Sequence, residues 1–399
     1  MTHFVPLLGV AIILLAAYAL SKDRKAISWR VVAWGLGLQI LVALFVLRTH
    51  AGYWLIEEVS GAFVKLLNCS FAGSSFVFGP LGEKNGSFGM IFAFQALPMI
   101  IFFASLSSIL YYLRVLPALV FLAGKVMFKL MRTSGAESLE VAASIVLGQT
   151  EAPLVIRPYL EELTDSELMT VMTAGMAHIA GSVFGAYVMF GAEPRHLMTA
   201  VVMTAPGTIL ISKMLVPETG SPKTAGKIER VAPQKAVNIL DAASRGVSDG
   251  LHLALNVAAM LIAFLALVYL ANGILSVVHT NLQGLLGWTL APVAWVVGVP
   301  WHDAKMVGNL MGTKLVLNEF VAFSMLGPMK GHIAERSFTI ATYALCGFAN
   351  FSSIGIQLGG IGALAPSRKH DLAKLGFRAV LAGTMANYLA AAIAGLLLN

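Results

Sequence analysis

Long runs without a charged residue place this chain in a membrane. Six runs contain no Asp, Glu, Lys or Arg: residues 4–20, 31–47, 92–113, 251–275, 338–366 and 379–399. A bilayer-spanning helix needs about 20 predominantly apolar residues, so most of these runs are long enough to cross. Of all residues, 58% are hydrophobic and 12% are charged, whereas roughly a quarter are charged in soluble proteins. We therefore expect an all-α, multi-pass membrane protein.

The basic residues predict how the chain is oriented. The formal net charge is +7, and in a membrane protein Lys and Arg mark cytoplasmic loops rather than a nucleic-acid partner. We expect three basic loops in the cytoplasm and the N-terminus outside. Residues 4–20 are expected to be a retained first span, because no basic stretch precedes them and no small-residue cleavage site follows. The loops carry Lys22, Arg24, Lys25 and Arg30; Lys213, Lys223, Lys227, Arg230, Lys235 and Arg245; and Arg368, Lys369 and Lys374.

One segment of the first half is interrupted where a span would be continuous. Residues 137–160 are moderately apolar, but Gly148–Pro153 reads Gly-Gln-Thr-Glu-Ala-Pro at the middle. A re-entrant hairpin tolerates such a break, because irregular backbone at membrane depth can line a cavity. Ahead of it, we expect an interfacial stretch at residues 51–67 and a basic amphipathic helix at residues 115–133.

The second half repeats this plan. Residues 306–329 carry Asn318 and Glu319 at their middle, and the interval from Glu319 to the Asn350 region matches that from Glu151 to the Gly181 region. Broken helices in matching places in two halves indicate a transporter binding site. If residues 215–245 are cytoplasmic, the two hairpins enter from opposite faces, so their tips can meet near the midplane.

Glu151 and Glu319 are the principal candidate functional residues. A carboxylate at membrane depth costs at least about 2.5 kcal/mol, so it usually marks a substrate or ion path. The structural alternative is that each is paired with a basic residue, for which Arg157 and Lys314 are in range.

The polar residues around these two glutamates favour a neutral ligand. They offer many hydrogen-bonding groups but no arginine, which a phosphate or carboxylate substrate would require. Phe348 could pack on a ring. The set consists of Gln149, Thr150, Glu151, Asn318, Glu319, Asn350, Ser352 and Ser353.

Four motifs closely resemble the signatures of the concentrative nucleoside transporter family. These are Phe92–Pro98, Gly148–Pro153, Asn318–Ala322 and Cys346–Gly355, which occur in the family's order. The resemblance covers nearly the whole chain. It implies a homotrimer in a bacterial cytoplasmic (inner) membrane, in which a transport domain moves like an elevator past a scaffold.

The resemblance also implies roles for individual residues. Gln149, Thr150 and Glu151 would contact the nucleobase, and Val183 would line its pocket. The ribose would be held by Glu319, Asn350 and Ser353, with Phe348 beside the sugar and base.

The expected architecture is about eight transmembrane helices plus two oppositely oriented re-entrant hairpins, arranged as an inverted repeat. Residues 1–113 and 251–275 would form the scaffold, and residues 115–214 and 280–399 the two transport-domain repeats. A cytoplasmic polar loop would cover residues 215–250.

The coupling ion is where this sequence departs from the family pattern. Sodium-coupled relatives place an Asn four residues before the motif glycine and a Ser three residues before the Gly-Ser-Val turn. Here these positions hold Ser144 and His178, and an imidazole is a poor ligand for a hard cation. We therefore expect proton coupling rather than sodium coupling. Burial favours the protonated form of a carboxyl group and histidine titrates near neutrality, so Glu151, Glu319 and His178 are the candidate carriers.

Other functions remain as alternatives. A membrane-embedded enzyme could use Glu151 and Glu319 as acid and base, but no nucleophile or metal motif completes such a site. A transporter of dicarboxylates or sugars and a channel are further alternatives, but the polar residues at the tips of the two hairpins favour them less. No cofactor and no metal site are expected, because no His, Cys and Asp spacing matches one.

Overall fold

The computed structural model describes residues 4–84, 86, 89–228 and 236–398, and this part of the chain contains helices but no strand. Seven helical segments of the described residues are long and apolar enough to span a membrane, or up to eight if one bent pair counts as a span. The expected number was about eight, but the expected first span, residues 4–20, forms a helix of only 15 residues and is not among the seven. The helices are α1 (Val5–Ala19), α2 (Trp29–Arg48), α3 (His50–Phe78), α4 (Phe92–Tyr112), α5 (Val115–Met131), α6 (Gly135–Ser144), α7 (Asp165–Ala177), α8 (Gly181–Met189), α9 (Pro194–Leu215), α10 (Ile239–Leu275), α11 (Leu282–Val296), α12 (Trp301–Val316), α13 (Glu319–Leu326), α14 (Glu335–Leu345), α15 (Phe351–Leu364) and α16 (Lys369–Leu397).

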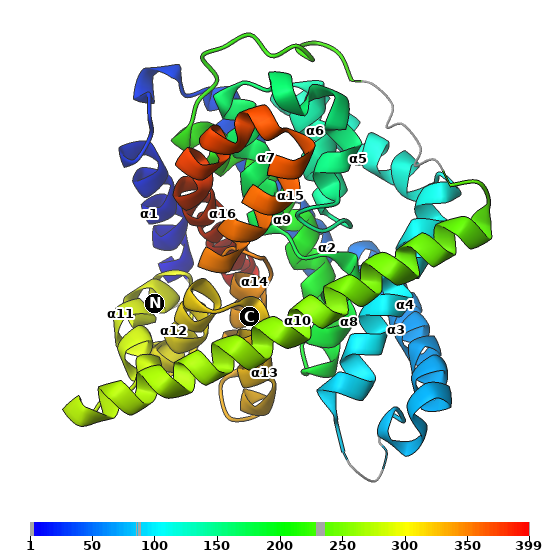
Figure 1. Cartoon of the computed structure of the whole chain (residues 1–399). Helices are drawn as coiled ribbons and strands as arrows, with labels where there is room; N and C mark the ends of the chain where they lie inside the picture. Colours follow the sequence, from blue (N-terminus) through cyan, green and yellow to red (C-terminus); the bar gives the residue numbers. More distant parts are fainter. Residues whose placement is uncertain (1–3, 85, 87–88, 229–235, 399) are drawn as a thin grey trace.

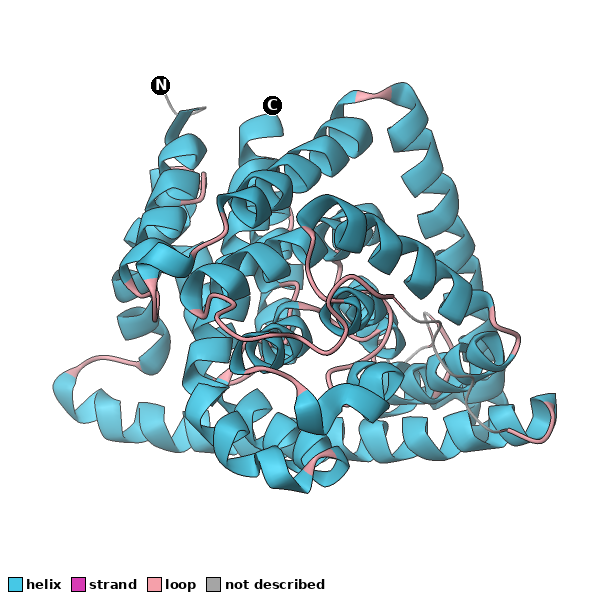
Figure 2. Ribbon diagram, turned by 90° about the horizontal axis from the view of Figure 1, so that it is seen from above, coloured by secondary structure: helices cyan, strands magenta, loops and turns pink. Residues whose placement is uncertain are grey.

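Burial separates an inner group of helices from an outer group. In the most apolar stretch of each segment, 94% of the residues are buried for α7 with α8 and 89% for α9, but only 11% for α10. Figure 1 shows α10 crossing the front of the molecule, and Figure 2 shows the helical layers from above. Since α10 is highly apolar yet exposed, its outer face is suited to lipid or to another protein surface.

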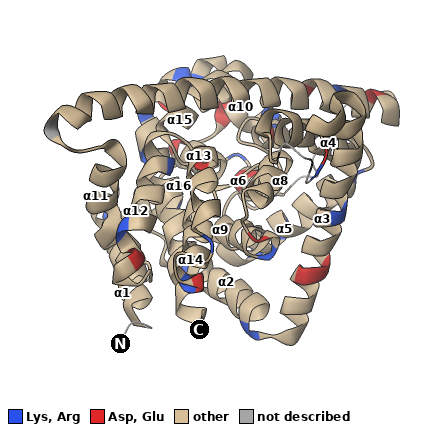
Figure 3. Cartoon of the chain, turned by 90° about the horizontal axis from the view of Figure 1, so that it is seen from below, with Lys and Arg blue, Asp and Glu red and all other residues tan. Residues whose placement is uncertain are grey.

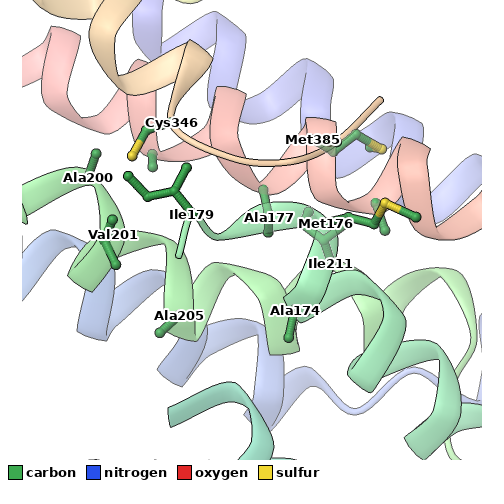
Figure 4. Close-up of a cluster of buried hydrophobic side chains, with 14 of the residues drawn as sticks. Ala174, Met176, Ala177, Ile179, Ala200, Val201, Ala205, Ile211, Cys346 and Met385 are labelled. Carbon is green, nitrogen blue, oxygen red and sulfur yellow. The ribbon is translucent and has the colours of Figure 1, made fainter. Parts of the chain in front are cut away.

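Small side chains allow the inner helices to approach closely. Ala174 and Ala177 of α7 lie in one buried cluster with Ala200 and Ala205 of α9 (Figure 4). On α16, a Cβ added at Gly383 would lie 2.7 Å from the Met176 Cβ. Such small residues are typical of helix–helix contacts in membranes, where association depends on close packing.

The loop between α1 and α2, the start of α7 and the loop before α16 meet at one end of the molecule. Asp165 accepts from Lys22 at 3.4 Å and lies 3.7 Å from the Arg368 guanidinium. Gly135, at the start of α6, donates its backbone N–H to Thr224 O at 3.1 Å. The described parts of the three basic loops therefore gather on one side, together with the base of the first hairpin.

The base of the second hairpin lies at the other end, with both termini. Arg336 donates to Leu398 O at 2.7 Å and to Gly298 O at 3.3 Å. Pro6 packs on the same corner, because a Cβ at Gly298 would lie 2.6 Å from the Pro6 Cγ. The two hairpins therefore enter from opposite ends, as expected from a cytoplasmic position of residues 215–245. Figure 3 shows how few charged residues the helices carry when the molecule is seen from below.

Two expected element boundaries differ from those of the structure. Residues 51–67 do not form an element of their own but lie within α3, which begins where the Thr49 hydroxyl accepts from Gly52 N at 3.0 Å. The polar loop predicted to reach residue 250 ends at Asn238, which caps α10 by accepting from Asp241 N at 2.9 Å. The first turns of α10 are polar because they are exposed and stabilised by an Asp241–Arg245 ion pair at 2.9 Å. Arg230 and Lys235 lie outside the described residues.

Candidate functional site

The tip of the first hairpin is held by local hydrogen bonds. Helix α6 begins with a capping box made by Ser134 and Glu137, and it ends at Ser144. The chain then turns until η4, a 3₁₀-helix over Ala152–Glu162. In the turn, Gly148 donates its N–H to the Glu151 carboxylate at 3.2 Å, and Glu151 N donates to Gly148 O at 3.0 Å. The Gly-Gln-Thr-Glu motif therefore forms a closed turn rather than a helix.

The tip of the second hairpin is shorter. Helix α12 ends at Val316, and Asn318 starts α13 by accepting from Val321 N at 3.0 Å. This cap places Glu319 at the first position of α13, where its side chain is only 3% exposed. An acidic residue at this position is also favoured by the helix dipole.

Two broken helices cross beside the tips. The break between α7 and α8 covers His178–Ala180, and the break between α14 and α15 covers residues 346–350. Phe348 N donates to His178 O at 3.2 Å, which joins the two breaks directly. Gly347 is needed here, because a Cβ would lie 2.4 Å from the Asn387 Oδ1 and 2.5 Å from Ala177 O.

A buried lysine and asparagine bind the carbonyl groups that the breaks leave free. Lys314 donates to Ala344 O at 3.0 Å and to Asn387 Oδ1 at 2.6 Å. Asn387 donates in turn to Ala177 O at 2.7 Å and to Cys346 O at 3.0 Å. The structural alternative for the glutamates is therefore not observed: among the described residues, neither Lys314 nor Arg157 forms an ion pair with Glu319 or Glu151.

The tips and breaks enclose a cavity of about 360 Å³ with one wall from α10. All eight residues that the sequence suggested for substrate binding line this cavity, and so do Asn318 and Ser352. The eight are Gln149, Thr150, Glu151, Val183, Glu319, Phe348, Asn350 and Ser353.

Hydrogen bonds between side chains orient the polar groups of the cavity. Glu319 accepts from Tyr187 OH at 3.1 Å and from Asn350 Nδ2 at 3.2 Å. Gln149 donates to Ser353 Oγ at 3.3 Å and accepts from Gln357 at 3.4 Å. A carboxylate and an amide of the same cavity are thus each held by neighbouring side chains, and a ligand that carries both hydroxyls and an amide edge can pair with them.

Several residues around this cavity were not predicted as site residues. The wall from α10 includes Leu253, Asn256 and Met260. Asn256 carried a signal, because it is the one polar residue in 253–268. Gln357, which positions Gln149, carried the same signal, because it is the one polar residue in 354–365. Tyr187, which positions Glu319, carried none, because it lies in an ordinary apolar helix.

Ser144 and His178, the candidate ion-site residues, are buried but do not line the cavity. The Ser144 hydroxyl donates to Glu140 at 3.0 Å. His178 pairs its Nδ1 with Ala174 O at 3.0 Å, and its buried Nε2 has no hydrogen-bond partner among the described residues.

Known protein families match consecutive parts of the chain. Residues 8–81 match the model described as the Na⁺ dependent nucleoside transporter N-terminus, residues 93–194 a nucleoside recognition model, and residues 196–395 the Na⁺ dependent nucleoside transporter C-terminus.

Individual proteins agree with these matches. The uncharacterized transporter YutK of Bacillus subtilis is 43% identical over 398 residues, 98% of each chain. Sodium/nucleoside cotransporter 1 of Rattus norvegicus is 41% identical over 98% of this chain, which spans 63% of the rat protein.

Solved structures show the same architecture. CNTnw in an inward-facing substrate-bound state superposes with a TM-score of 0.95 at 41% identity, covering 100% of this chain and 98% of that one. A variant of CNTnw in an outward-facing state gives 0.93 at 40% identity, with the same coverage of both chains. The scaffold and transport-domain arrangement of these proteins is therefore the fold of this chain, which belongs to the concentrative nucleoside transporter family, a family of transporters rather than enzymes.

Proposed function

We propose that this chain imports nucleosides by symport with protons. The observation that carries the proposal is the cavity where the two oppositely inserted hairpin tips meet, with Glu151 and Glu319 both in its lining. Glu319, Asn350 and Ser353 bind the ribose, and Gln149, Thr150 and Glu151 bind the base. Val183 and Phe348 supply apolar contact. A carboxylate accepts from sugar hydroxyls, and a side-chain amide can both donate to and accept from a base edge.

A neutral ligand is favoured by what the cavity wall contains. Among the described residues that line it there is no Lys or Arg. A nucleotide phosphate would need such groups or a free helix N-terminus. The N-termini of α13 and α15 reach the cavity, but Asn318 and Asn350 accept from the Val321 and Ser353 N–H groups there, and the Glu319 carboxylate would repel a phosphate. The cavity volume of about 360 Å³ falls within the range of about 300–1,000 Å³ usual for small-molecule sites.

Alternating access would occur by an elevator movement. The mobile part comprises residues 115–214 and 280–399, and the scaffold comprises residues 1–113 and 251–275. Helix α10 meets the cavity largely through apolar side chains such as Leu253, Val257 and Met260. Apolar contacts are non-directional, so one surface can slide along the other without losing a fixed hydrogen-bond pattern.

The proton is the proposed coupling ion because two oxygen ligands of the family's sodium site are altered. Ser144 directs its hydroxyl to Glu140 at 3.0 Å rather than offering an amide oxygen. His178 offers an imidazole where sodium-coupled relatives have a hydroxyl. Symport with sodium is the alternative. The matching family model is described as Na⁺ dependent, and the rat relative is named as a sodium/nucleoside cotransporter.

The coupling ion can be measured directly. In proteoliposomes without sodium on either side, an inward proton gradient should raise uridine uptake several-fold. In a second assay, an inward sodium gradient without a proton gradient should not raise it. A protonophore should remove the stimulation. Uptake that follows sodium and ignores the proton gradient would show that the chain is a sodium symporter.

We also propose the membrane arrangement. The chain would lie in a bacterial cytoplasmic membrane with its N-terminus outside, since the basic loops gather at one end of the molecule. It would assemble as a homotrimer, for which the exposed apolar face of α10 and its neighbours provides surface. Labelling of single cysteines on either side and the mass of the solubilised complex test these two points.

Replacing Gln149 with Ala should alter base preference more than it lowers uptake. The amide contacts only one edge of the base, whereas Glu319 and Asn350 still hold the ribose. Competition of unlabelled purine and pyrimidine nucleosides against labelled uridine should show a changed order. Gln39→Ala is the matched control, because Gln39 is buried in α2, away from the cavity, and donates to Gly35 O of its own helix at 3.2 Å. An unchanged order in the Gln149 variant would remove that residue from base recognition.

A further inference from the structure

Glu140 is a buried carboxyl group that nucleoside binding does not use. It lies on α6, one helical turn before Ser144, and its side chain is 0% exposed. One oxygen accepts from the Ser144 hydroxyl at 3.0 Å. The other is buried without a hydrogen-bond partner among the described residues, and no ion pair in that part of the chain includes Glu140.

A second glutamate on the same helix has the charged partner that Glu140 lacks. Glu137 is equally buried, but it bonds the Lys213 ammonium at 2.7 Å and accepts from Ser134 N at 2.7 Å. Its charge is therefore compensated. A buried carboxylate without such partners costs several kcal/mol, so it takes up a proton instead. The geometry thus indicates that Glu140 is a neutral acid in this conformation.

Among the described residues, no basic side chain near α6 is available as a counter-charge. Helices α5, α7, α9 and η4 pack against α6, and residues 224–228 lie against its start, where Lys227 is exposed. Lys213 is already bound by Glu137 and Glu218, and Lys125, Lys129 and Arg157 are exposed. The titratable and charged groups on these four elements are Lys125 and Lys129; Arg157, Tyr159, Glu161 and Glu162; Asp165 and Glu167; and Arg195, His196 and Lys213, with His178 directly after α7.

A second cavity lies beside the hairpin tip that follows α6, although neither Glu140 nor Ser144 lines it. It has a volume of about 530 Å³ and is lined by Val146 and Leu147, which follow Ser144, and by Glu151, Arg157 and Asp249. The charged side chains in its wall favour water over lipid. This cavity shares Glu151 with the nucleoside cavity, so the hairpin tip contacts both.

We propose that Glu140 is the group that carries the coupling proton. The inference rests on the proposed proton symport. Water entering beside the tip delivers a proton to the free carboxylate oxygen, and the O–H bond forms as a hydronium ion loses one proton. The arm that holds Gln149, Thr150 and Glu151 then crosses without a net charge on Glu140. Release to water on the other side restores the carboxylate. Ser144, which takes the place of a sodium ligand in relatives, stabilises the carboxyl group through its hydroxyl.

The test measures proton movement and nucleoside binding separately. Uridine added to wild-type proteoliposomes that contain a trapped pH indicator should acidify the lumen. Glu140→Gln copies the neutral acid, so uridine binding in detergent should stay within about twofold and uridine exchange should persist, while uridine-driven acidification is lost. Glu161→Gln, an exposed carboxyl on the other arm of the hairpin, is the matched control and should acidify like the wild type.

The outcomes separate the inference from the function on which it rests. A wild type that moves no protons with uridine would refute proton symport itself. A wild type that does, with an equally active Glu140→Gln variant, would overturn the role of Glu140 alone. Sodium-stimulated uptake that Glu140→Gln abolishes would make Glu140 a sodium ligand instead. If the Gln variant fails to bind uridine, Glu140→Asp and Ser144→Ala replace it: each should shift the pH dependence of uptake, and an unchanged dependence in both would refute the proposal.

Discussion

Replacing Glu319 with Gln should weaken uridine binding by roughly 10- to 100-fold, since a hydrogen bond to a charged group contributes about 1.5–3 kcal/mol. Most uptake should be lost with it. The carboxylate accepts from Tyr187 OH and from Asn350 Nδ2 at 3.1 and 3.2 Å. An amide of the same shape would place an NH₂ group against one of these donors. The substitution therefore removes the acceptor for the ribose and also disturbs the groups that position it.

Titration calorimetry on the solubilised protein and uridine uptake in proteoliposomes measure the two effects. Tyr187→Phe is the matched control, because it removes one hydrogen bond to Glu319 and keeps the carboxylate. It should weaken binding by less than the Gln variant does. Uptake at the wild-type rate in Glu319→Gln would contradict the role of this residue in ribose recognition.

The elements of the candidate site could be predicted because each is a local irregularity. Polar residues in the middle of apolar segments, such as Gln149 and Asn318, mark a break that an uninterrupted transmembrane helix would not contain. Caps by Asn318 and Asn350 fix where each next helix begins. Such signals act within a few residues of the chain, so the order of hairpins and breaks follows from the sequence. Contact of the eight predicted residues with a nucleoside stays a prediction.

Contacts between distant segments could not be predicted in this way. Lys314 and Asn387 are 73 residues apart, and neither has a neighbour in the sequence that reveals the other. The wall provided by α10 is a further case, because its position depends on packing against α4. There Gly250 allows an approach that a Cβ, 2.8 Å from the Ala104 Cβ, would prevent. The start of α10 was missed because its exposed polar turns resemble a loop in composition.

Replacing Asn387 with Leu should destabilise the crossing of the two broken helices. The change leaves Ala177 O and Cys346 O without their donor and removes one acceptor from the Lys314 ammonium. All three groups are in the interior, where each orphaned partner costs roughly 1–3 kcal/mol, so we expect a loss of about 3 kcal/mol or more. Since the breaks carry Phe348 and Asn350 into the cavity, uridine binding should fall together with stability.

Thermal unfolding of the solubilised protein, followed by a thiol-reactive dye or by loss of the monodisperse peak, measures this effect. Thr384→Val, on the same helix, is the matched control: its hydroxyl is buried without a hydrogen-bond partner among the described residues, so removing it should leave Tm unchanged or raise it. Lys314→Met should behave like Asn387→Leu, because it leaves another carbonyl at the breaks, Ala344 O, without the side-chain donor that binds it. If both variants unfolded at the wild-type temperature, the lysine and asparagine would not hold the crossing. The broken helices would then have to be kept in place by the packing of their small side chains alone.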